Sequence, residues 1–417
     1  MPNLIFDKTT RADQIAMMLD DAKFEVISDR AAGMPDLTLI NDIRAKKAPP
    51  TVPKVFLSNN CTFNCAYCNC RSTNDRQRYC HQPRELAKIA VDDAVKNNHG
   101  VFITSAIEKN ANYTEEMIVE TLRIMRKELN YGGYIHAKIM PGTDPLLIKQ
   151  AGQYANRLSV NIEVAQSAGY SMIAKQKNKE NILTPMQHIS NFIKEAKDSG
   201  KTAYSSVWKE GKFASSQSTQ LMAGSSGESD RTIMNLASAM YKKYSLKRVY
   251  YTAFQYKHDA KGYDGLDHVS TPLWRMARLY QGDRLMELYG FDADDVTPDN
   301  APNLEIDIDP KAAWALRHMD LYPVEINRAD YDALIRIPGI GTTSAQKILR
   351  MRKHCTITHD LLRQMNVPLK RGISFITCNG KFGGTWSDDI SLMRQALVTG
   401  PQAASSGTVP SFWNDFG

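Results

Sequence analysis

Three closely spaced cysteines are the residues in this sequence best suited to chemistry. They are Cys61, Cys65 and Cys68, separated by three residues and then by two. Three thiolates on one short loop can bind three irons of a cubane iron–sulfur cluster, which leaves the fourth iron without a protein ligand. A zinc site and three reduced, metal-free thiols are the alternatives, but zinc loops usually supply two pairs of ligands and need four. The spacing therefore favours a 4Fe–4S cluster with one open iron.

The other cysteines have less definite roles among the seven in the chain. Cys70 lies two residues beyond the third cysteine of the motif. It is either a fourth ligand to the cluster when substrate is absent or merely a nearby thiol. Cys80, Cys355 and Cys378 are scattered, and we predict no role for them because a buried, unreactive thiol is the usual state of a cysteine.

Composition restricts the class of protein. The chain has 417 residues, of which 42% are hydrophobic and 23% charged, as is ordinary for a globular protein. The first twenty residues have no apolar core followed by a small-residue cleavage site, so a secretory signal is not expected. No run of apolar residues approaches the roughly 18 needed to span a bilayer. We expect a cytoplasmic protein without a membrane segment.

Strand-like and helix-like segments alternate on both sides of the cysteine motif. After a helix at about 11–23, the strands expected are 54–58, 101–105, 134–139, 158–164, 218–223 and 248–255, and the helices are 83–97, 114–129, 144–155, 184–199, 230–244 and 274–289. Six strand–helix units indicate an α/β fold with a parallel sheet covered by helices. Because the units end before the eighth, we predict a partial (β/α)6 TIM-like barrel. A doubly wound open sheet is the alternative that periodicity leaves open.

The motif resembles the signature of the radical S-adenosylmethionine superfamily. Besides the three cysteines, the aromatic Tyr67 before the third one matches, and the motif directly follows the first expected strand, where that superfamily carries it. The resemblance implies that S-adenosylmethionine binds the open iron through its amino and carboxylate groups. One electron from the cluster would then yield methionine and a 5′-deoxyadenosyl radical. Tyr67 would lie near the adenine.

The same resemblance implies further contacts to the cofactor at the carboxyl ends of strands. Ser105 occupies the place of the superfamily's amino-group-binding stretch but departs from its sequence. The strand with Ser159, Asn161 and Glu163 resembles the one that contacts the ribose and carboxylate. The turn containing Gly224 and Glu228 resembles the glycine-containing turn beside the adenine. For each, a solvated strand end or loop is the alternative.

The C-terminal part of the chain is basic and carries a second motif. The segment 311–381 has 12 Lys and Arg against 5 Asp and Glu, so it accounts for the whole net charge of +7. Within it, a Pro-Gly-Ile-Gly turn joins two expected helices and resembles a helix-hairpin-helix motif, which binds DNA backbone phosphates. Its amides would point outward at a helix N-terminus, a natural phosphate site. Protein contact or simple packing is the alternative. The residues expected to bind DNA are Gly339, Gly341, Thr342, Thr343, Lys347 and Arg350.

Taken together, residues 51–381 resemble a family of DNA modification and repair proteins that join a radical S-adenosylmethionine domain to a small α-helical helix-hairpin-helix domain. The resemblance implies DNA as partner and an electron donor such as flavodoxin or ferredoxin. An RNA-modifying radical enzyme and a DNA-binding protein with a structural cluster are the alternatives. Arg71, Arg76 and Arg78 follow the cysteine motif. In one interpretation they line the entrance to the active site, and in the other they lie on a solvated loop. The expected parts are a lead-in (1–50), the radical domain (51–290), a linker (291–325), the hairpin module (326–381) and a tail (382–417).

Overall fold

The computed structural model describes residues 52–203, 208–255, 263, 271–384 and 386–399. The expected helix at 11–23 and the lead-in before residue 51 lie outside this range. The chain separates into two compact units, one comprising residues 1–228 and 239–276, the other residues 229–238 and 277–417. We refer to them as the sheet unit and the C-terminal unit. The boundary falls within a helix at residue 276, not at residue 290 as the sequence indicated.

The sheet unit contains six parallel strands in sequential order, as predicted. The strands are β1 (Lys54–Phe56), β2 (Val101–Thr104), β3 (Ile135–Lys138), β4 (Arg157–Ser159), β5 (Ser216–Ala223) and β6 (Leu246–Ala253). Among the described strands, β1 and β6 are the two edges of the sheet. A doubly wound sheet reverses its strand order at a switch point, whereas this order never reverses. The fold is therefore an open, partial TIM-like barrel.

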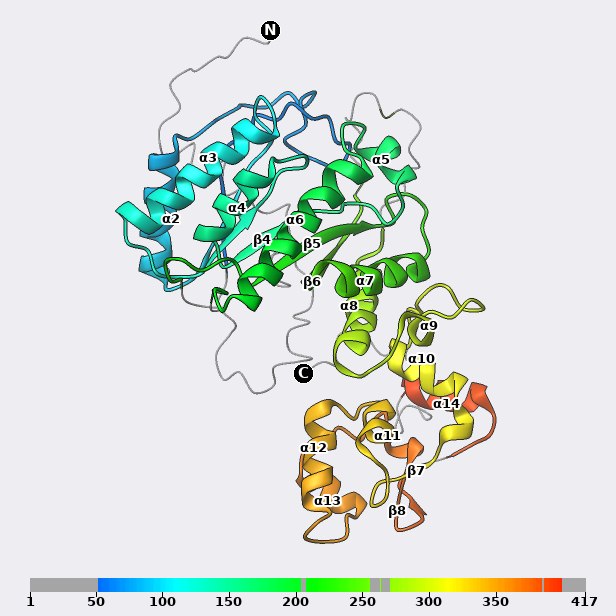
Figure 1. Cartoon of the computed structure of the whole chain (residues 1–417). Helices are drawn as coiled ribbons and strands as arrows, with labels where there is room; N and C mark the ends of the chain where they lie inside the picture. The colour runs from blue at the N-terminus through cyan, green and yellow to red at the C-terminus, as the bar shows by residue number, and fades with distance from the viewer. Residues whose placement is uncertain (1–51, 204–207, 256–262, 264–270, 385, 400–417) are drawn as a thin grey trace. The chain divides into compact units, whose positions relative to one another are not determined.

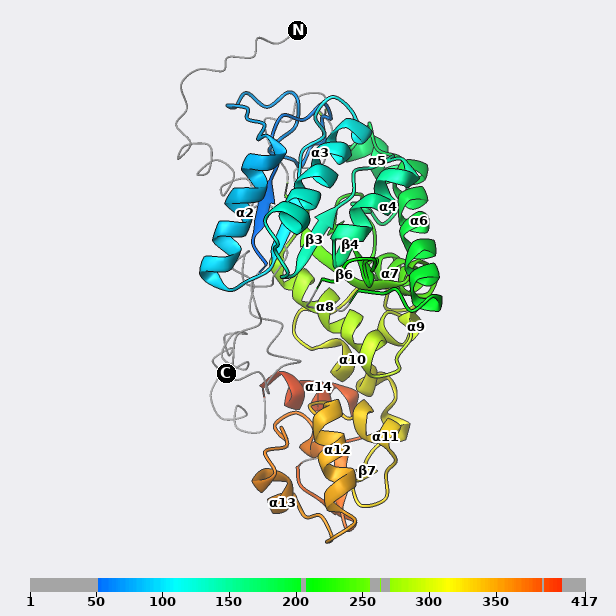
Figure 2. The ribbon, with the colours of Figure 1, turned by 60° about the vertical axis from the view of Figure 1, so that its left-hand side comes forward.

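Helices connect successive strands (Figures 1 and 2). They are α2 (Pro83–Asn97), α3 (Ala111–Arg123), α4 (Pro145–Tyr154), α5 (Ala168–Ile173), α6 (Lys179–Asp198) and α7 (Asp230–Tyr244). The sheet curves, because His136 on β3 lies within 3.5 Å of Ser218 on β5, across the intervening β4. The neighbouring Gln217 points the other way and donates to backbone carbonyls of α6 and α7. One face of the sheet is thus a concave interior and the other packs against helices.

Two helix starts differ from the prediction because asparagine caps begin the helices earlier. α3 starts after Asn110, whose side chain accepts the Tyr113 amide, and not at Thr114. α6 starts after Asn178, which forms a capping box with Asn181, and not at Thr184. α3 continues as a π-helical turn, Ile124–Glu128.

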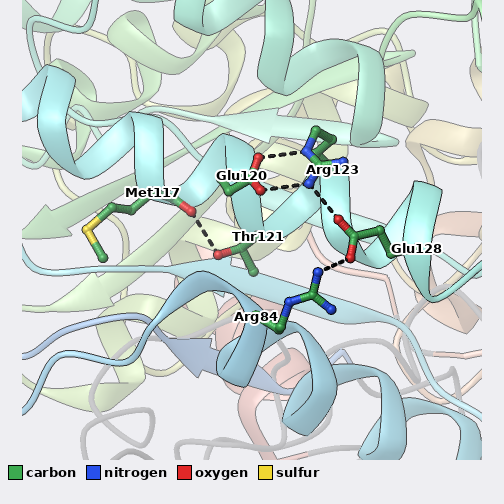
Figure 3. Close-up of polar contacts among 6 residues, drawn as sticks. All are labelled: Arg84, Met117, Glu120, Thr121, Arg123 and Glu128. Carbon is green, nitrogen blue, oxygen red and sulfur yellow. Dashed lines mark hydrogen bonds and ion pairs between the residues drawn. The ribbon is translucent and has the colours of Figure 1, made fainter.

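A surface network ties this π-helical turn to α2 (Figure 3). Arg123 donates to both carboxylate oxygens of Glu120 at 2.7 Å and to Glu128 at 2.6 Å. Glu128 also pairs with Arg84 on α2. Exposed pairs of this kind add little stability each, so we regard the network as a surface feature.

The C-terminal unit is less purely helical than expected. It contains α8 (Leu273–Leu288) from Ala277 onward, α9 (Ala293–Val296), α10 (Pro310–Arg317), α11 (Tyr331–Arg336), α12 (Thr342–Met351), α13 (His359–Gln364) and α14 (Ile390–Thr399). Three short strands, β7 (Val324–Glu325), β8 (Ile376–Cys378) and β9 (Lys381–Phe382), form a separate small sheet. The helix α14 lies in the expected tail, of which residues 400–417 are outside the described range.

The segment expected as a linker, 291–325, belongs to the C-terminal unit and contains α9, α10 and β7. Asp309 caps α10 through the amides of Lys311 and Ala312. Trp314 on α10 is 3% exposed and donates to Asp295 at 3.0 Å. Asp292 and Asp309 therefore serve as helix caps, and Pro310 occupies the first turn of α10. Among the described helices, none is both long and apolar enough to cross a bilayer.

Candidate cofactor site

The cysteine loop leaves the carboxyl end of β1 and is fixed by backbone hydrogen bonds. Thr62 donates to Ile107 beyond β2, and Ala66 donates to Ile173 at the end of α5, both at 2.8 Å. Two amides also point at thiols, since Phe63 and Cys70 donate to the sulfurs of Cys61 and Cys68 at 3.4 Å. Amide donors of this kind stabilise a thiolate or a cluster ligand more than a neutral thiol.

The three thiols lie within electrostatic reach of one another. Burial, with smaller contributions from Cys68 and Cys61, raises the pKa of Cys65 to about 12, although the charge of Lys177 opposes the rise. Burial and Cys68 likewise raise the pKa of Cys61. Among the described residues, no three His, Cys, Asp or Glu side chains already form a metal-binding group. The three neighbouring thiols on one braced loop, with amides donating to two of them, nevertheless have the chemistry that a cluster with three thiolate ligands requires.

A buried ion pair lies beside the cysteine loop. The ammonium of Lys177 contacts a carboxylate oxygen of Glu163 at 2.7 Å and the hydroxyl of Tyr67 at 3.1 Å. The side chains of Lys177 and Glu163 are 11% and 3% exposed. Burial favours the neutral amine, but the Glu163 carboxylate and the Cys65 thiol together outweigh it and raise the pKa of Lys177, which stays charged.

The backbone of Glu163 has an uncommon conformation. Its φ is 63°, in the left-handed region that a residue with a side chain enters only at a cost of about 1–3 kcal/mol. Hydrogen bonds to β5 hold it there, since its amide donates to Gln220 at 2.9 Å and its carbonyl accepts from Met222 at 2.8 Å. The uncommon conformation thus occurs at the residue whose carboxylate contacts Lys177.

Two of the predicted cofactor residues thus meet, and Lys177 joins them. Tyr67 and Glu163 had been expected at the cofactor from the motif and from the strand. Lys177 was missed, because no motif or periodicity marks the loop after α5. The sequence could have pointed to Lys177 only as a lysine in a connection after the fourth strand, where a barrel places its site residues.

The other predicted cofactor residues are placed differently. Ser159 is 3% exposed, and its hydroxyl has no hydrogen-bond partner among the described residues. Asn161 is also buried. Ser105 donates to the backbone carbonyl of Ala106 at 2.7 Å, so its hydroxyl is engaged within its own loop.

Glu228 is engaged within its own turn. Its carboxylate accepts hydrogen bonds from the amide of Gly224 and from the amide and hydroxyl of Ser226. Gly224 has a φ of 80°, and a Cβ there would lie 1.9 Å from the hydroxyl oxygen of Thr271. The turn therefore requires glycine on steric grounds, and Glu228 stabilises it.

Two of the three arginines expected either at an entrance or on a solvated loop brace the cysteine loop. Arg78 donates to the carbonyls of Asn59, Cys70, Arg71 and Asn74 at 2.7–2.9 Å. Arg71 is 1% exposed and donates to the Cys68 carbonyl at 3.1 Å. Their guanidinium groups satisfy backbone carbonyls of an irregular loop. Arg76 is half-buried.

The remaining cysteines differ in their exposure. Cys70 and Cys378 are buried, and Cys355 is exposed. Burial, and then the nearby Glu108, raise the pKa of Cys80 to about 12, which keeps that thiol protonated and unreactive.

In the C-terminal unit, the predicted hairpin joins α11 to α12. Gly339 is exposed with a φ of 80°, and a Cβ there would lie 2.9 Å from the Pro368 carbonyl. Gly341 caps α12. Thr342 is half-buried. Thr343 is exposed.

The two basic residues predicted on α12 differ in their surroundings. Lys347 donates to the Met365 carbonyl at the end of α13 at 3.0 Å, which engages its ammonium within the unit. Arg350 is exposed. Of these two residues, only Arg350 presents its positive charge on the exposed surface of α12.

Comparison with known proteins gives similarity of fold only. No family model matches the chain, and no curated protein matches it. Among solved structures, the FeFe-hydrogenase maturase HydG from Carboxydothermus hydrogenoformans is 14% identical, with a TM-score of 0.44, over 66% of this chain and 64% of that one. Methylornithine synthase PylB is 15% identical, with a TM-score of 0.41, over 56% of this chain and 61% of that one.

A third solved structure is the radical S-adenosylmethionine methyltransferase TsrM from Kitasatospora setae, determined with its tryptophan substrate. It is 10% identical, with a TM-score of 0.34, over 50% of this chain and 40% of that one. The chain spans less than two thirds of the length of each of these structures.

Proposed function

We propose that the chain is a radical S-adenosylmethionine enzyme that acts on DNA. The observation that carries the proposal is the meeting of the Cys61–Cys68 loop with Tyr67, Glu163 and Lys177 beyond the ends of β1 and β4. Active sites of barrel folds lie at this end of the strands. A zinc site would not account for a buried cation beside the thiols.

The residues proposed for the cofactors follow from their positions. Cys61, Cys65 and Cys68 bind the 4Fe–4S cluster. Tyr67, Asn161 and Glu163, with Lys177, are the proposed contacts of S-adenosylmethionine, and Ser159 lies deeper on the same strand. When bound, the cluster supplies one electron to cleave S-adenosylmethionine into methionine and a carbon radical that abstracts hydrogen from a substrate.

The protein's own part is to position these groups and to keep water out. Tyr67, Glu163 and Lys177 are largely buried, and the loop that carries the cysteines is braced by Arg78. Burial, and then Glu163, hold the pKa of Tyr67 well above its ordinary value, so its hydroxyl remains neutral. A neutral phenol can stack against a ring and donate a hydrogen bond without adding charge.

Features of the C-terminal unit support DNA as substrate. The positive-φ turn at Gly339 is exposed, as are Thr343 and Arg350 on α12. Lys353 and Lys370 in the same unit are exposed as well. Exposed turn amides and basic side chains bind backbone phosphates and do not read the base sequence. Such binding is compatible with an enzyme whose target base leaves the base stack or is single-stranded.

The test is cofactor cleavage by the full chain. The protein is reconstituted without oxygen, reduced, and given S-adenosylmethionine with DNA, with RNA or with neither, and 5′-deoxyadenosine is measured. We expect cleavage that DNA stimulates more than RNA. A variant with Ala at Cys61, Cys65 and Cys68 should bind no cluster, whereas Cys80→Ala should behave as wild type.

Each other outcome corrects a part of the proposal. Cleavage that nucleic acid leaves unchanged would contradict the substrate, and stimulation by RNA alone would replace DNA with RNA. An intact cluster without any cleavage would indicate a structural cluster in a DNA-binding protein.

A further inference from the structure

We infer that Lys177 raises the reduction potential of the cluster held by Cys61, Cys65 and Cys68, and that Glu163 opposes this effect. The inference rests on the proposed function, because it presupposes the cluster. It assigns to Lys177 an electrostatic role in electron uptake that is separate from any contact with S-adenosylmethionine.

The loop that carries Lys177 is attached directly to the cysteine loop. The Ala66 amide donates to Ile173 at 2.8 Å, and the Asn64 amide donates to the Gln176 side chain at 3.3 Å. Lys177 itself donates to Tyr67, which lies between the second and third cysteines of the motif. The ammonium is thereby fixed close to the thiols and does not sample the solvent as a surface lysine would.

Burial makes this charge effective. The Lys177 side chain is 11% exposed, so neither solvent nor salt screens it as they would an exposed charge. Lys177 and Glu163 are 2.7 Å apart, and Lys177 contacts Tyr67 between two of the cysteines at 3.1 Å. Because their charges are opposite and both lie beside the cysteine loop, they act on negative charge at the cysteine sulfurs with opposite signs.

Reduction of the cluster is a gain of negative charge at the same place. One electron passes from a reduced donor of the flavodoxin or ferredoxin class to the oxidised cluster, and no bond or proton is transferred. A nearby ammonium stabilises the more negative, reduced cluster, and a nearby carboxylate destabilises it. Hydrogen bonds and local charge are established determinants of cluster potential.

The test is a redox titration of the reconstituted full chain without S-adenosylmethionine, followed by electron paramagnetic resonance of the reduced cluster. Lys177→Met should make reduction at least tenfold less favourable, a fall of about 59 mV for one electron. Glu163→Gln should shift the potential the other way, and the double variant should return toward wild type. Lys179→Met, two residues further on at an exposed position, is the matched control and should leave the potential unchanged.

The outcomes separate this inference from the proposed function. A protein that binds no iron overturns both. A normal cluster whose potential does not move in Lys177→Met, or shifts that have the same sign in Lys177→Met and Glu163→Gln, overturn the role of Lys177 alone. If Lys177→Met fails to load a cluster, Glu163→Gln decides alone, and an unchanged or lowered potential in it contradicts the inference.

Discussion

Glu115 on α3 is a buried carboxyl group whose charge depends on pH. It has no exposed surface, and one of its oxygens accepts the Met140 amide at 3.0 Å. The other oxygen has no hydrogen-bond partner among the described residues. Burial raises the pKa of Glu115 to about 8. At neutral pH the folded protein therefore keeps this carboxyl protonated.

The raised pKa predicts a loss of stability as pH rises. Below about pH 4.5, the pKa of this group in the unfolded chain, Glu115 is protonated in both the folded and the unfolded state. Its ionisation then does not change the free energy of unfolding. Between there and about pH 8 only the unfolded state releases the proton, so unfolding becomes easier, and above pH 8 the loss levels off. We expect Glu115→Gln, which cannot ionise, to gain about 1–3 kcal/mol relative to wild type between pH 5 and pH 9.

Urea unfolding of both proteins at pH 5, 7 and 9 checks this prediction. Glu116→Gln is the matched control, because Glu116 is the next residue and exposed. A difference between wild type and Glu115→Gln that stays constant with pH would contradict a buried, protonated Glu115.

At this scale the sequence was most informative where a motif spans neighbouring residues. Cys61, Cys65, Cys68 and Tyr67 could be predicted because their spacing alone describes the site. Lys177 could not, since its contact with Glu163 depends on how α5 packs against the cysteine loop. The carboxylate of Glu228 was expected at the cofactor, but local hydrogen bonds within its own turn compete for it.

At the scale of elements, the π-helical turn after α3 directs Arg126 into the protein. Arg126 is 2% exposed and donates to the carbonyls of Tyr131, Gly133 and Tyr154 at 2.6–2.8 Å and to Asn156 at 2.9 Å. Burial lowers its pKa to about 9, so it remains largely charged at neutral pH. One side chain thus joins the connections that precede β3 and β4.

We predict that Arg126→Met lowers the free energy of unfolding by about 2–5 kcal/mol, because buried carbonyls lose their donor. Denaturant unfolding of the sheet unit in the full chain measures this loss. Arg123→Met, three residues earlier on the surface, should cost far less, since its ion pairs are exposed (Figure 3). Equal losses in the two variants would show that the buried hydrogen bonds contribute nothing special.

Six strands and their parallel pairing followed from alternation in the sequence, because strands buried on both faces are short apolar runs. Helix starts did not follow as well. Thr114 and Thr184 are good caps by residue type, yet Asn110 and Asn178 bind the first amides. Local preference allows several caps, and tertiary packing selects one of them.

At the scale of the whole molecule, the net charge of +7 comes from residues 311–381. Several of these charges are engaged internally, including Lys347 and the buried Lys311, whose ammonium donates to the Ile340 carbonyl. The number of basic residues therefore overstates the charge available to a polyanion. In the segment expected as a linker, 291–325, some acidic residues are likewise engaged, since Asp292 and Asp309 accept hydrogen bonds from amides at helix N-termini.

We predict that Arg350→Ala weakens binding of the full chain to DNA and reduces the slope of log affinity against log salt by about 1, as for one lost phosphate contact. Fluorescence anisotropy at several salt concentrations measures both. Lys194→Ala removes an exposed charge from α6 and should change neither. An equal effect of both variants would mean that DNA responds to overall charge and not to the hairpin.

At Glu163 the backbone conformation favours glycine, whereas the ion pair with Lys177 requires a carboxylate side chain. Glycine would adopt that conformation without strain, but it would leave the ammonium of Lys177 buried without its carboxylate. Variation selected only for thermal tolerance would therefore tend to exchange both residues together, for glycine and an apolar side chain. Relatives that retain both Glu163 and Lys177 would have a less stable fold but keep the charged site. Stability and activity thus place opposite requirements on these two positions.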